Sequence, residues 1–250
     1  MRKWSYRWLL VLLAAVGLTA DQWSKYGMFG WLHNGRQQVS SGAFAAWDDA
    51  VRAWVAGAPP GITGGRSDVW PGWFGFIAQY HRTPRQPDTD WRNSLQTVSA
   101  NELPVVNRGA LFGMGANHDG SPEAEQQAQN ANTLFAVISL IAASGIVAWA
   151  VWRGKKADAW ICAALGLILG GTVGNLFDRV VFHGVRDFLF FYKIDWPVFN
   201  VADCCLVCGA IMLVLHAVFV KPPKAPATQT TTATAATDTP TPTPAPTTAG

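Results

Sequence analysis

The chain has 250 residues, of which half are hydrophobic and only 14% are charged, whereas about a quarter of the residues in soluble domains are charged. This deficit of charge predicts a membrane protein. The net charge of +3 is too small, and the basic runs are too short, for a protein that follows nucleic-acid phosphates.

The first apolar stretch, residues 8–28, follows a basic start. A cleaved signal peptide has the same charge pattern but ends in small residues at both cleavage positions, and Leu18 occupies the first of them. We therefore expect a retained membrane span. If about 20 residues cross the hydrocarbon, Asp21 lies roughly 10 Å inside the far boundary. Lys25 follows one helical turn later, so the two side chains could simply form an interfacial ion pair.

Residues 30–131 are polar, rich in Gly and Pro, and contain several tryptophans, which predicts an external insertion. Within it, residues 41–57 have apolar side chains at helical spacing and predict a helix that lies on the membrane surface. Residues 58–93 are broken by Pro and Gly and show neither the helical nor the strand period. Residues 103–114, around Asn107, predict an extended strand that leads into a glycine turn.

Three further apolar stretches predict membrane helices at residues 132–152, 158–177 and 198–220. The third predicted span carries Gly166, Gly170 and Gly174 at four-residue intervals, a spacing that favours close helix contact. The expected fold is therefore an all-α membrane protein, with four transmembrane helices, an extracytoplasmic strand-containing loop and a surface helix.

Basic residues lie at the N-terminus, in the loop of residues 153–156 and after the last span. By the positive-inside rule, both termini and this loop are cytoplasmic, and residues 178–197 are external. We expect a four-helix domain at residues 1–220. Residues 221–250 are almost entirely Pro, Thr and Ala, a composition typical of a disordered extension, which would lie in the cytosol.

This topology brings polar residues together in one layer near the outer membrane boundary. Polar groups this close to hydrocarbon are costly unless they are paired or used, so we expect a shared site. The residues are Asp21, Asn175, Asp178, Asp187, Asn200 and Asp203. We expect Asp178 to form an ion pair with its neighbour Arg179 and to support the site, not to act in catalysis.

The chemistry of this layer is best explained by paired carboxylates. The sequence shows no serine beside a histidine, no phosphate loop and no metal-ligand cluster, and His183 stands alone on the outer turn. The four cysteines lie in apolar stretches and are interpreted as packing residues. Two adjacent carboxylates share one proton, so the pair can activate water and protonate a leaving amine, as in aspartic peptidases.

Two other classes remain open on these residues alone. Acidic residues in membrane spans also serve as proton relays, so a small proton-coupled transporter or channel subunit is the alternative, although no internal repeat is found. The acids could also be purely structural partners of Lys25 and Arg179.

Five short motifs occur in order along the predicted spans and their connections. They are Asp21-Gln-x-Ser-Lys25, Asn107-x-Gly-Ala-x-Phe112, Gly174-Asn-Leu-Phe-Asp-Arg179, Val185-Arg-Asp187-Phe and Phe199-Asn-Val-Ala-Asp203. Each motif alone is weak, but together the chain resembles the lipoprotein signal peptidase family, also called signal peptidase II. The segment before Asn107 is longer than is usual in that family. It could be a lid, a docking surface or a lipid-facing apron.

The resemblance implies an aspartic peptidase of the bacterial inner membrane that removes signal peptides from prolipoproteins, just before a diacylglyceryl-modified cysteine. Its partners would be the lipidated prolipoprotein and membrane lipids, without nucleic acid, cofactor or metal, and we expect a monomer. Asp187 and Asp203 match the catalytic dyad, and Asp21 and Lys25 match structural positions. Positions that hold substrate or steady the dyad correspond to Asn107, Gly109, Asn175, Arg179 and Asn200.

Overall fold

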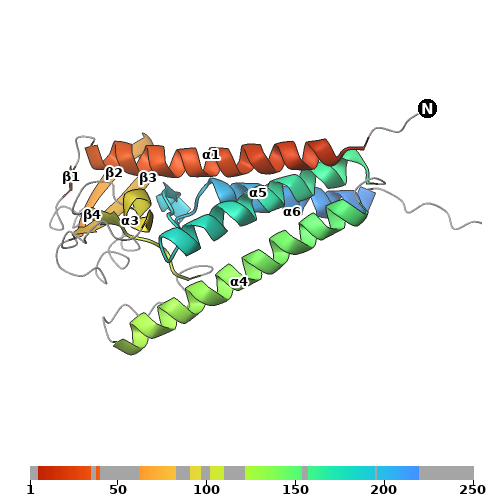
Figure 1. Cartoon of the computed structure of the whole chain (residues 1–250). Helices are drawn as coiled ribbons and strands as arrows, with labels where there is room; N and C mark the ends of the chain where they lie inside the picture. The colour runs from red at the N-terminus through yellow and green to blue at the C-terminus, as the bar shows by residue number, and fades with distance from the viewer. Residues whose placement is uncertain are drawn as a thin grey trace, which may run out of the picture. The chain divides into compact units, whose positions relative to one another are not determined.

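Four long helices and a small antiparallel sheet make up the part of the chain that the structure describes (Figure 1). This structure is a computed structural model, and it describes residues 5–34, 38–39, 62–82, 91–96, 102–109, 122–153, 157–194 and 196–219. The long helices are α1 (Arg7–Asn34), α4 (Pro122–Trp152), α5 (Ala159–Val181) and α6 (Val201–Phe219). Of these, α4, α5 and α6 are long and apolar enough to cross a membrane.

The helices are longer at their polar ends than the sequence predicted. The first was expected at residues 8–28, and α1 continues to Asn34. The second was expected from residue 132, but α4 begins at Pro122, with Glu123 and Glu125 in its first turn. Proline suits the first helical position, and acidic side chains near it interact favourably with the helix dipole. A search for long hydrophobic stretches therefore does not detect the polar ends of these helices.

Glycines allow α5 to approach α1 and α6 closely. An added Cβ at Gly166 would lie 2.7 Å from the backbone oxygen of Leu10, and one at Gly170 would lie 2.7 Å from that of Ala14. On another face of α5, a Cβ at Gly171 would lie 2.4 Å from the backbone oxygen of Ala202 in α6. The predicted glycine face is confirmed, and this contact brings polar residues of three helices within reach of one another.

The sheet has the strand order β1-β2-β3-β4, with β5 also paired to β3. Its strands are β1 (Gln38–Val39), β2 (Ile62–Trp70), β3 (Phe74–Arg82), β4 (Glu102–Pro104) and β5 (Leu189–Phe190), and a short helix, α3, spans Trp91–Gln96. The hairpin of β2 and β3 occupies the region that the sequence left unassigned. Its turn contains Pro71 and Gly72, with Gly72 at φ 81°, and Trp73 donates to the Trp70 carbonyl at 3.0 Å. This is the proline-glycine pattern of a type II turn.

The sheet packs on the end of α1 through a small apolar core. Phe29 and Leu32 of α1 contact Ala78 and Tyr80 of β3 and Phe188, and all five are buried. The Tyr80 hydroxyl also donates to the Phe29 carbonyl. Because Phe188 follows Asp187 directly, this core fixes one of the expected catalytic residues relative to α1.

Two expected elements cannot be compared with the structure. The surface helix at residues 41–57 and the tail at residues 221–250 lie outside the described residues. The expected strand at residues 103–114 is present in part, because β4 covers Glu102–Pro104 and Asn107 forms an isolated bridge with Val185. Residues 110–114 also lie outside the described part.

Candidate active site

Asp187 lies in the connection between α5 and α6, which runs as an extended segment along the sheet. Val185 exchanges two backbone hydrogen bonds of 2.7 Å with Asn107. Two residues beyond Asp187, Leu189 pairs with β3 and bridges Phe199. Backbone pairing on both sides therefore fixes the position of the Asp187 carboxylate.

Asp203 lies in the first turn of α6, and Asn200 immediately precedes this helix. The Asn200 side-chain oxygen accepts from the Asp203 backbone N–H at 3.1 Å, and Asp203 Oδ2 accepts from the Asn200 backbone N–H at 3.1 Å. This reciprocal arrangement is a capping box, which satisfies two backbone donors that the helix itself cannot use. The cap holds one oxygen of the Asp203 carboxylate.

Three asparagine side chains connect the two carboxylates. Asn200 Nδ2 donates to Asp187 Oδ1 at 2.6 Å, and Asn107 Nδ2 donates to Asp187 Oδ2 at 3.0 Å. Asn175 Nδ2, from α5, donates to Asp203 Oδ1 at 2.9 Å. Neutral amide donors orient ionised oxygens without removing their charge, so the two carboxylates form a positioned pair.

The electrostatics of this pair favour one shared proton. Burial raises the pKa of Asp187 to about 7, and the negative charge of Asp203 also raises it, against the lowering effect of the Asn107 and Asn200 hydrogen bonds. Asp187 and Asp203 are both only partly buried. The pair therefore combines a raised pKa with access from outside, which is the combination expected of a catalytic site.

A second ionic cluster lies behind the pair and is fully enclosed. Lys25 donates to Asp21 at 2.8 Å and lies 3.3 Å from Asp178, and Arg186 contacts the Asp178 carboxylate at 2.8 Å. All four side chains are buried. Lys25 also donates to Asn175 Oδ1 at 3.2 Å, and Asn175 in turn donates to Asp203, which links this cluster to the carboxylate pair. Both enclosed carboxylates are therefore paired with cations.

The predicted ion pair between Asp178 and Arg179 was wrong. Neighbouring residues on a helix point about 100° apart, so the two side chains face different surroundings. Asp178 contacts Arg186 and Lys25. Arg179 donates to Asn132 Oδ1 at 3.2 Å and to the Gly109 carbonyl at 3.3 Å. The partner predicted for Asp178 is therefore corrected, and its supporting role stays a prediction.

Comparisons with known proteins decide between the alternatives that the sequence left open. Residues 92–219 match the family described as signal peptidase (SPase) II. A lipoprotein signal peptidase of Rhodopirellula baltica is 35% identical over 170 residues, which are 62% of this chain and 68% of that relative. The chain belongs to the signal peptidase II family.

Further relatives have the same name. The lipoprotein signal peptidase of Rhizorhabdus wittichii is 50% identical over 98 residues, 38% of this chain and 54% of that protein, so this match spans about half of the relative. A solved bacterial membrane enzyme covers 88% of this chain and 99% of its own, with a TM-score of 0.49 and 18% identity. As a family, signal peptidase II comprises bacterial aspartic-type membrane proteases that process prolipoproteins, so membership favours the peptidase over the transporter.

Three residues that take part in these hydrogen-bond networks were not singled out from the sequence. Gln22 donates to Asp178 at 3.3 Å and accepts from Arg186 at 2.9 Å. Gln22 and Arg186 both lie inside the five short motifs, so a polar residue next to a matched one was the available signal. Asn132 exchanges hydrogen bonds with Arg179, and it was read only as the start of a span.

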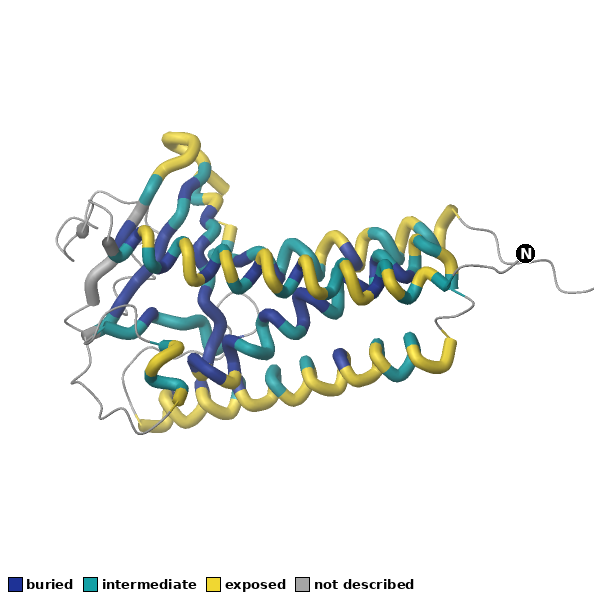
Figure 2. Tube along the Cα trace, turned by 45° about the horizontal axis from the view of Figure 1, so that its top comes forward, coloured by how far each residue is buried: buried dark blue, intermediate teal, exposed yellow. Residues whose placement is uncertain are grey.

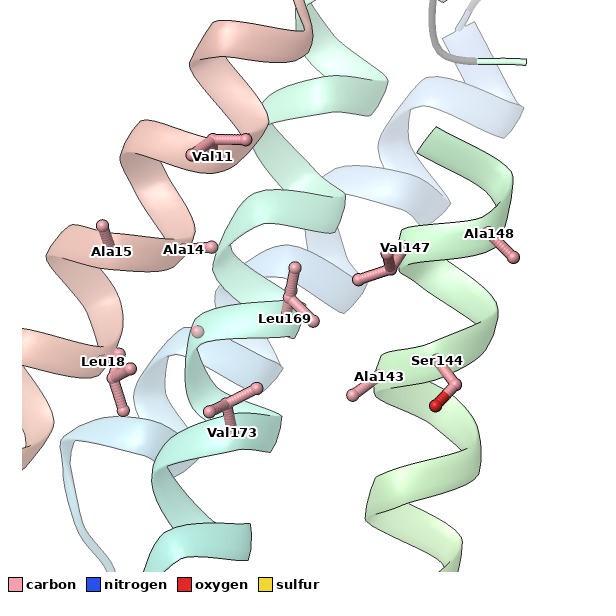
Figure 3. A pocket seen from close by; sticks show the side chains of 11 residues that line it. Val11, Ala14, Ala15, Leu18, Ala143, Ser144, Val147, Ala148, Leu169 and Val173 are labelled. Carbon is pink, nitrogen blue, oxygen red and sulfur yellow. The ribbon is translucent and has the colours of Figure 1, made fainter. Parts of the chain in front are cut away.

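An apolar cavity of about 650 Å³ lies between α1, α4 and α5 (Figure 3). Its lining includes Leu18, Val147 and Val173, with Ser144 as a polar member. On α5, Val173 lies about 200° of helical rotation from Asn175, so the cavity lies on a different face of this helix from Asn175 and the carboxylate pair that it contacts. Within the described residues, no group of three His, Cys, Asp or Glu side chains could hold a metal ion.

Proposed function

We propose that Asp187 and Asp203 are the catalytic dyad with which this signal peptidase II family member cuts a prolipoprotein, just before a diacylglyceryl-modified cysteine. The observation that carries the proposal is the Asn200 side chain, which bridges the dyad at 2.6 Å from Asp187 Oδ1 and 3.1 Å from the Asp203 backbone nitrogen. These two carboxylates are partly exposed, whereas Asp21 and Asp178 are completely buried and paired with cations.

The reaction follows from a dyad that carries one proton. The ionised carboxylate takes a proton from water, and the water oxygen attacks the scissile carbonyl carbon. The protonated carboxyl group stabilises the resulting oxyanion by hydrogen bonding and restores a proton to the leaving amine when the C–N bond breaks. Each turnover consumes one water and returns the dyad to its one-proton state.

The supporting residues have separate proposed roles. Asn107, Asn175 and Asn200 orient the carboxylate oxygens through the hydrogen bonds described above. Arg179, anchored by Asn132 and the Gly109 carbonyl, interacts electrostatically with Asp187 and Asp203 and is placed to bind the substrate peptide. Asp21, Lys25 and Asp178 hold α1, α5 and the Asp187 segment together.

For topology, we propose four spans, including α1, with both termini cytoplasmic and the dyad near the outer face. The support is the distribution of Lys and Arg around the apolar stretches. Reporter fusions at Gly115 and Gly154 should report opposite sides of the membrane. If both report the same side, the proposed topology is wrong.

We further propose that the enzyme acts as a monomer, because the dyad and its donors all come from one chain.

The proposed specificity can be tested by comparing a lipidated substrate with the same substrate without lipid. Acyl chains anchor the scissile bond at the membrane boundary, where a dyad at the start of α6 can reach it. Purified protein in lipid nanodiscs should remove the signal peptide from a diacylglyceryl-modified prolipoprotein much faster than from the same precursor without lipid, as read by gel mobility. Equal cleavage of both precursors would overturn the lipid requirement.

A further inference from the structure

An exposed aromatic patch lies on the hairpin of β2 and β3, beside the segment that follows β5. We call it the aromatic tip. Its members are Val69, Trp70, Trp73, Phe191, Ile194 and Trp196, with exposed fractions from 37% for Phe191 to 63% for Trp70. A contiguous apolar surface of this kind on a folded sheet usually marks a surface that contacts a partner or lipid.

The aromatic tip is built by specific contacts. The rings of Trp70 and Trp73 stack at a centroid distance of 5.6 Å. The Tyr192 hydroxyl donates to the Trp70 carbonyl at 3.0 Å, which joins the hairpin turn to the segment after β5. Lys193 Nζ lies 5.5 Å from the centre of the Trp73 ring. The turn and the segment after β5 therefore present two tryptophans and one cation together.

The position of the aromatic tip relates it to the membrane helices. Figure 2 shows the hairpin extending sideways from the end of α1, with its exposed turn away from the helices. Phe191 stacks on Phe199 at 5.7 Å, and Phe199 lies two residues before α6, which is long and apolar enough to cross a membrane. This stacking joins the aromatic tip to the segment that leads directly into α6.

The chemistry of the aromatic tip matches one occupant. Tryptophan concentrates at the boundary between lipid headgroups and acyl chains, where its ring is apolar and its N–H can reach water. Residues 69–73 carry no charge, and Lys193 beside them suits anionic lipid phosphates. We propose that the aromatic tip inserts into the headgroup boundary of the bilayer leaflet next to the dyad, with phospholipid as its partner.

Such an anchor would set the height of the dyad in the membrane. The hairpin is tied to the Asp187 segment, because Phe76 of β3 pairs with Leu189 and Ile77 donates to the Phe188 carbonyl at 2.9 Å. A lipid-anchored tip therefore fixes Asp187 relative to the bilayer surface through the sheet. The lipid contact itself does not depend on which residues are catalytic.

The test is the quenching of tryptophan fluorescence by brominated lipids in the full-length protein. The chain has 13 tryptophans, so the signal of the aromatic tip is taken as the difference between the wild-type protein and a Trp70→Phe/Trp73→Phe double variant, which keeps aromatic rings in place. In phosphatidylcholine–phosphatidylglycerol nanodiscs, lipids brominated near the headgroup should quench this difference signal. Aqueous iodide should not. Bromine near the chain ends should quench it less.

Trp152, 83% exposed at the end of the candidate span α4, provides the matched control. The fluorescence difference between the wild-type and Trp152→Phe proteins should also be quenched by lipids brominated near the headgroup. This confirms that the brominated lipids are present in the nanodiscs. With this control in place, an aromatic-tip signal that iodide quenches and bromine does not would place the tip in water. A signal that neither agent reaches would mean that protein covers it. Either result overturns the lipid assignment.

Discussion

Asn200 caps the helix that carries Asp203 and, with the same side chain, donates to Asp187. Its oxygen accepts from the Asp203 backbone N–H at 3.1 Å, and its nitrogen lies 2.6 Å from Asp187 Oδ1. One residue thus sets the start of α6 and the spacing of the two carboxylates. Because a cap fixes backbone geometry, the backbone of the fold positions the two carboxylates, in addition to the side-chain hydrogen bonds.

The rate of signal-peptide cleavage should depend on pH through this pair. Burial and the charge of Asp203 raise the pKa of Asp187 to about 7, so Asp187 holds the shared proton below that pH and loses it above. We expect kcat/KM to fall about tenfold per pH unit above pH 7, where Asp187 loses this proton. A rate that stays level from pH 6 to 9 would contradict a shared proton.

The raised pKa of Asp187 also makes the stability of the folded protein depend on pH. Asp187 binds its proton more tightly in the folded protein than in the unfolded chain, so this contribution is present at low pH and is lost as pH rises through about 7. The wild-type protein should therefore lose more thermal stability between pH 5 and pH 8 than an Asp187→Asn variant does. Identical losses would mean that Asp187 does not titrate in this range.

Asp178→Asn should damage the fold more than the chemistry. It removes the negative charge that Lys25 and Arg186 share at 3.3 and 2.8 Å, and the loss of one partner from a buried ion pair typically costs about 3–5 kcal/mol. We expect a lower melting temperature and a lower yield, with substantial activity per folded molecule. An Asp178→Asn protein of normal stability without activity would assign Asp178 to catalysis.

Gly171→Ala should separate α5 from α6. The new Cβ would lie 2.4 Å from the Ala202 backbone oxygen, so one helix has to move, at a cost of about 1–3 kcal/mol. That movement carries Asn175 away from Asp203, and cleavage should fall together with the melting temperature. Gly145→Ala, with nothing within 4 Å of the new Cβ, is the matched control and should leave both unchanged.

The helices, and the proximity of Asp187 and Asp203, could be predicted from the sequence because each has a local signature. Apolar length indicated the helices, and Asp187 and Asp203 stand in recognisable motifs. Arg186 could not be found in this way as a partner of Asp178, because it lies eight residues away and is brought there by the turn at residues 182–184. The β2–β3 hairpin was also hidden, because glycines interrupt the alternation of its strands and its pairing with β5 joins residues more than 100 positions apart.

Cys204→Ser should be tolerated. Cys204 is half-buried beside Asp203, and serine is nearly the same size. A dyad that activates water needs no thiol, so the variant should keep most of its cleavage activity and its stability. A Cys204→Ser protein that folds normally but does not cleave would point to thiol chemistry.

The most direct test of the central claim is the cleavage of a diacylglyceryl-modified prolipoprotein by the wild-type, Asp187→Asn and Asp203→Asn proteins in nanodiscs, with melting temperatures measured in parallel. Asparagine keeps the size of the side chain but cannot cycle a proton. The account predicts folded variants whose turnover is lower by several orders of magnitude. A folded Asp203→Asn protein that cleaves at nearly the wild-type rate would contradict it.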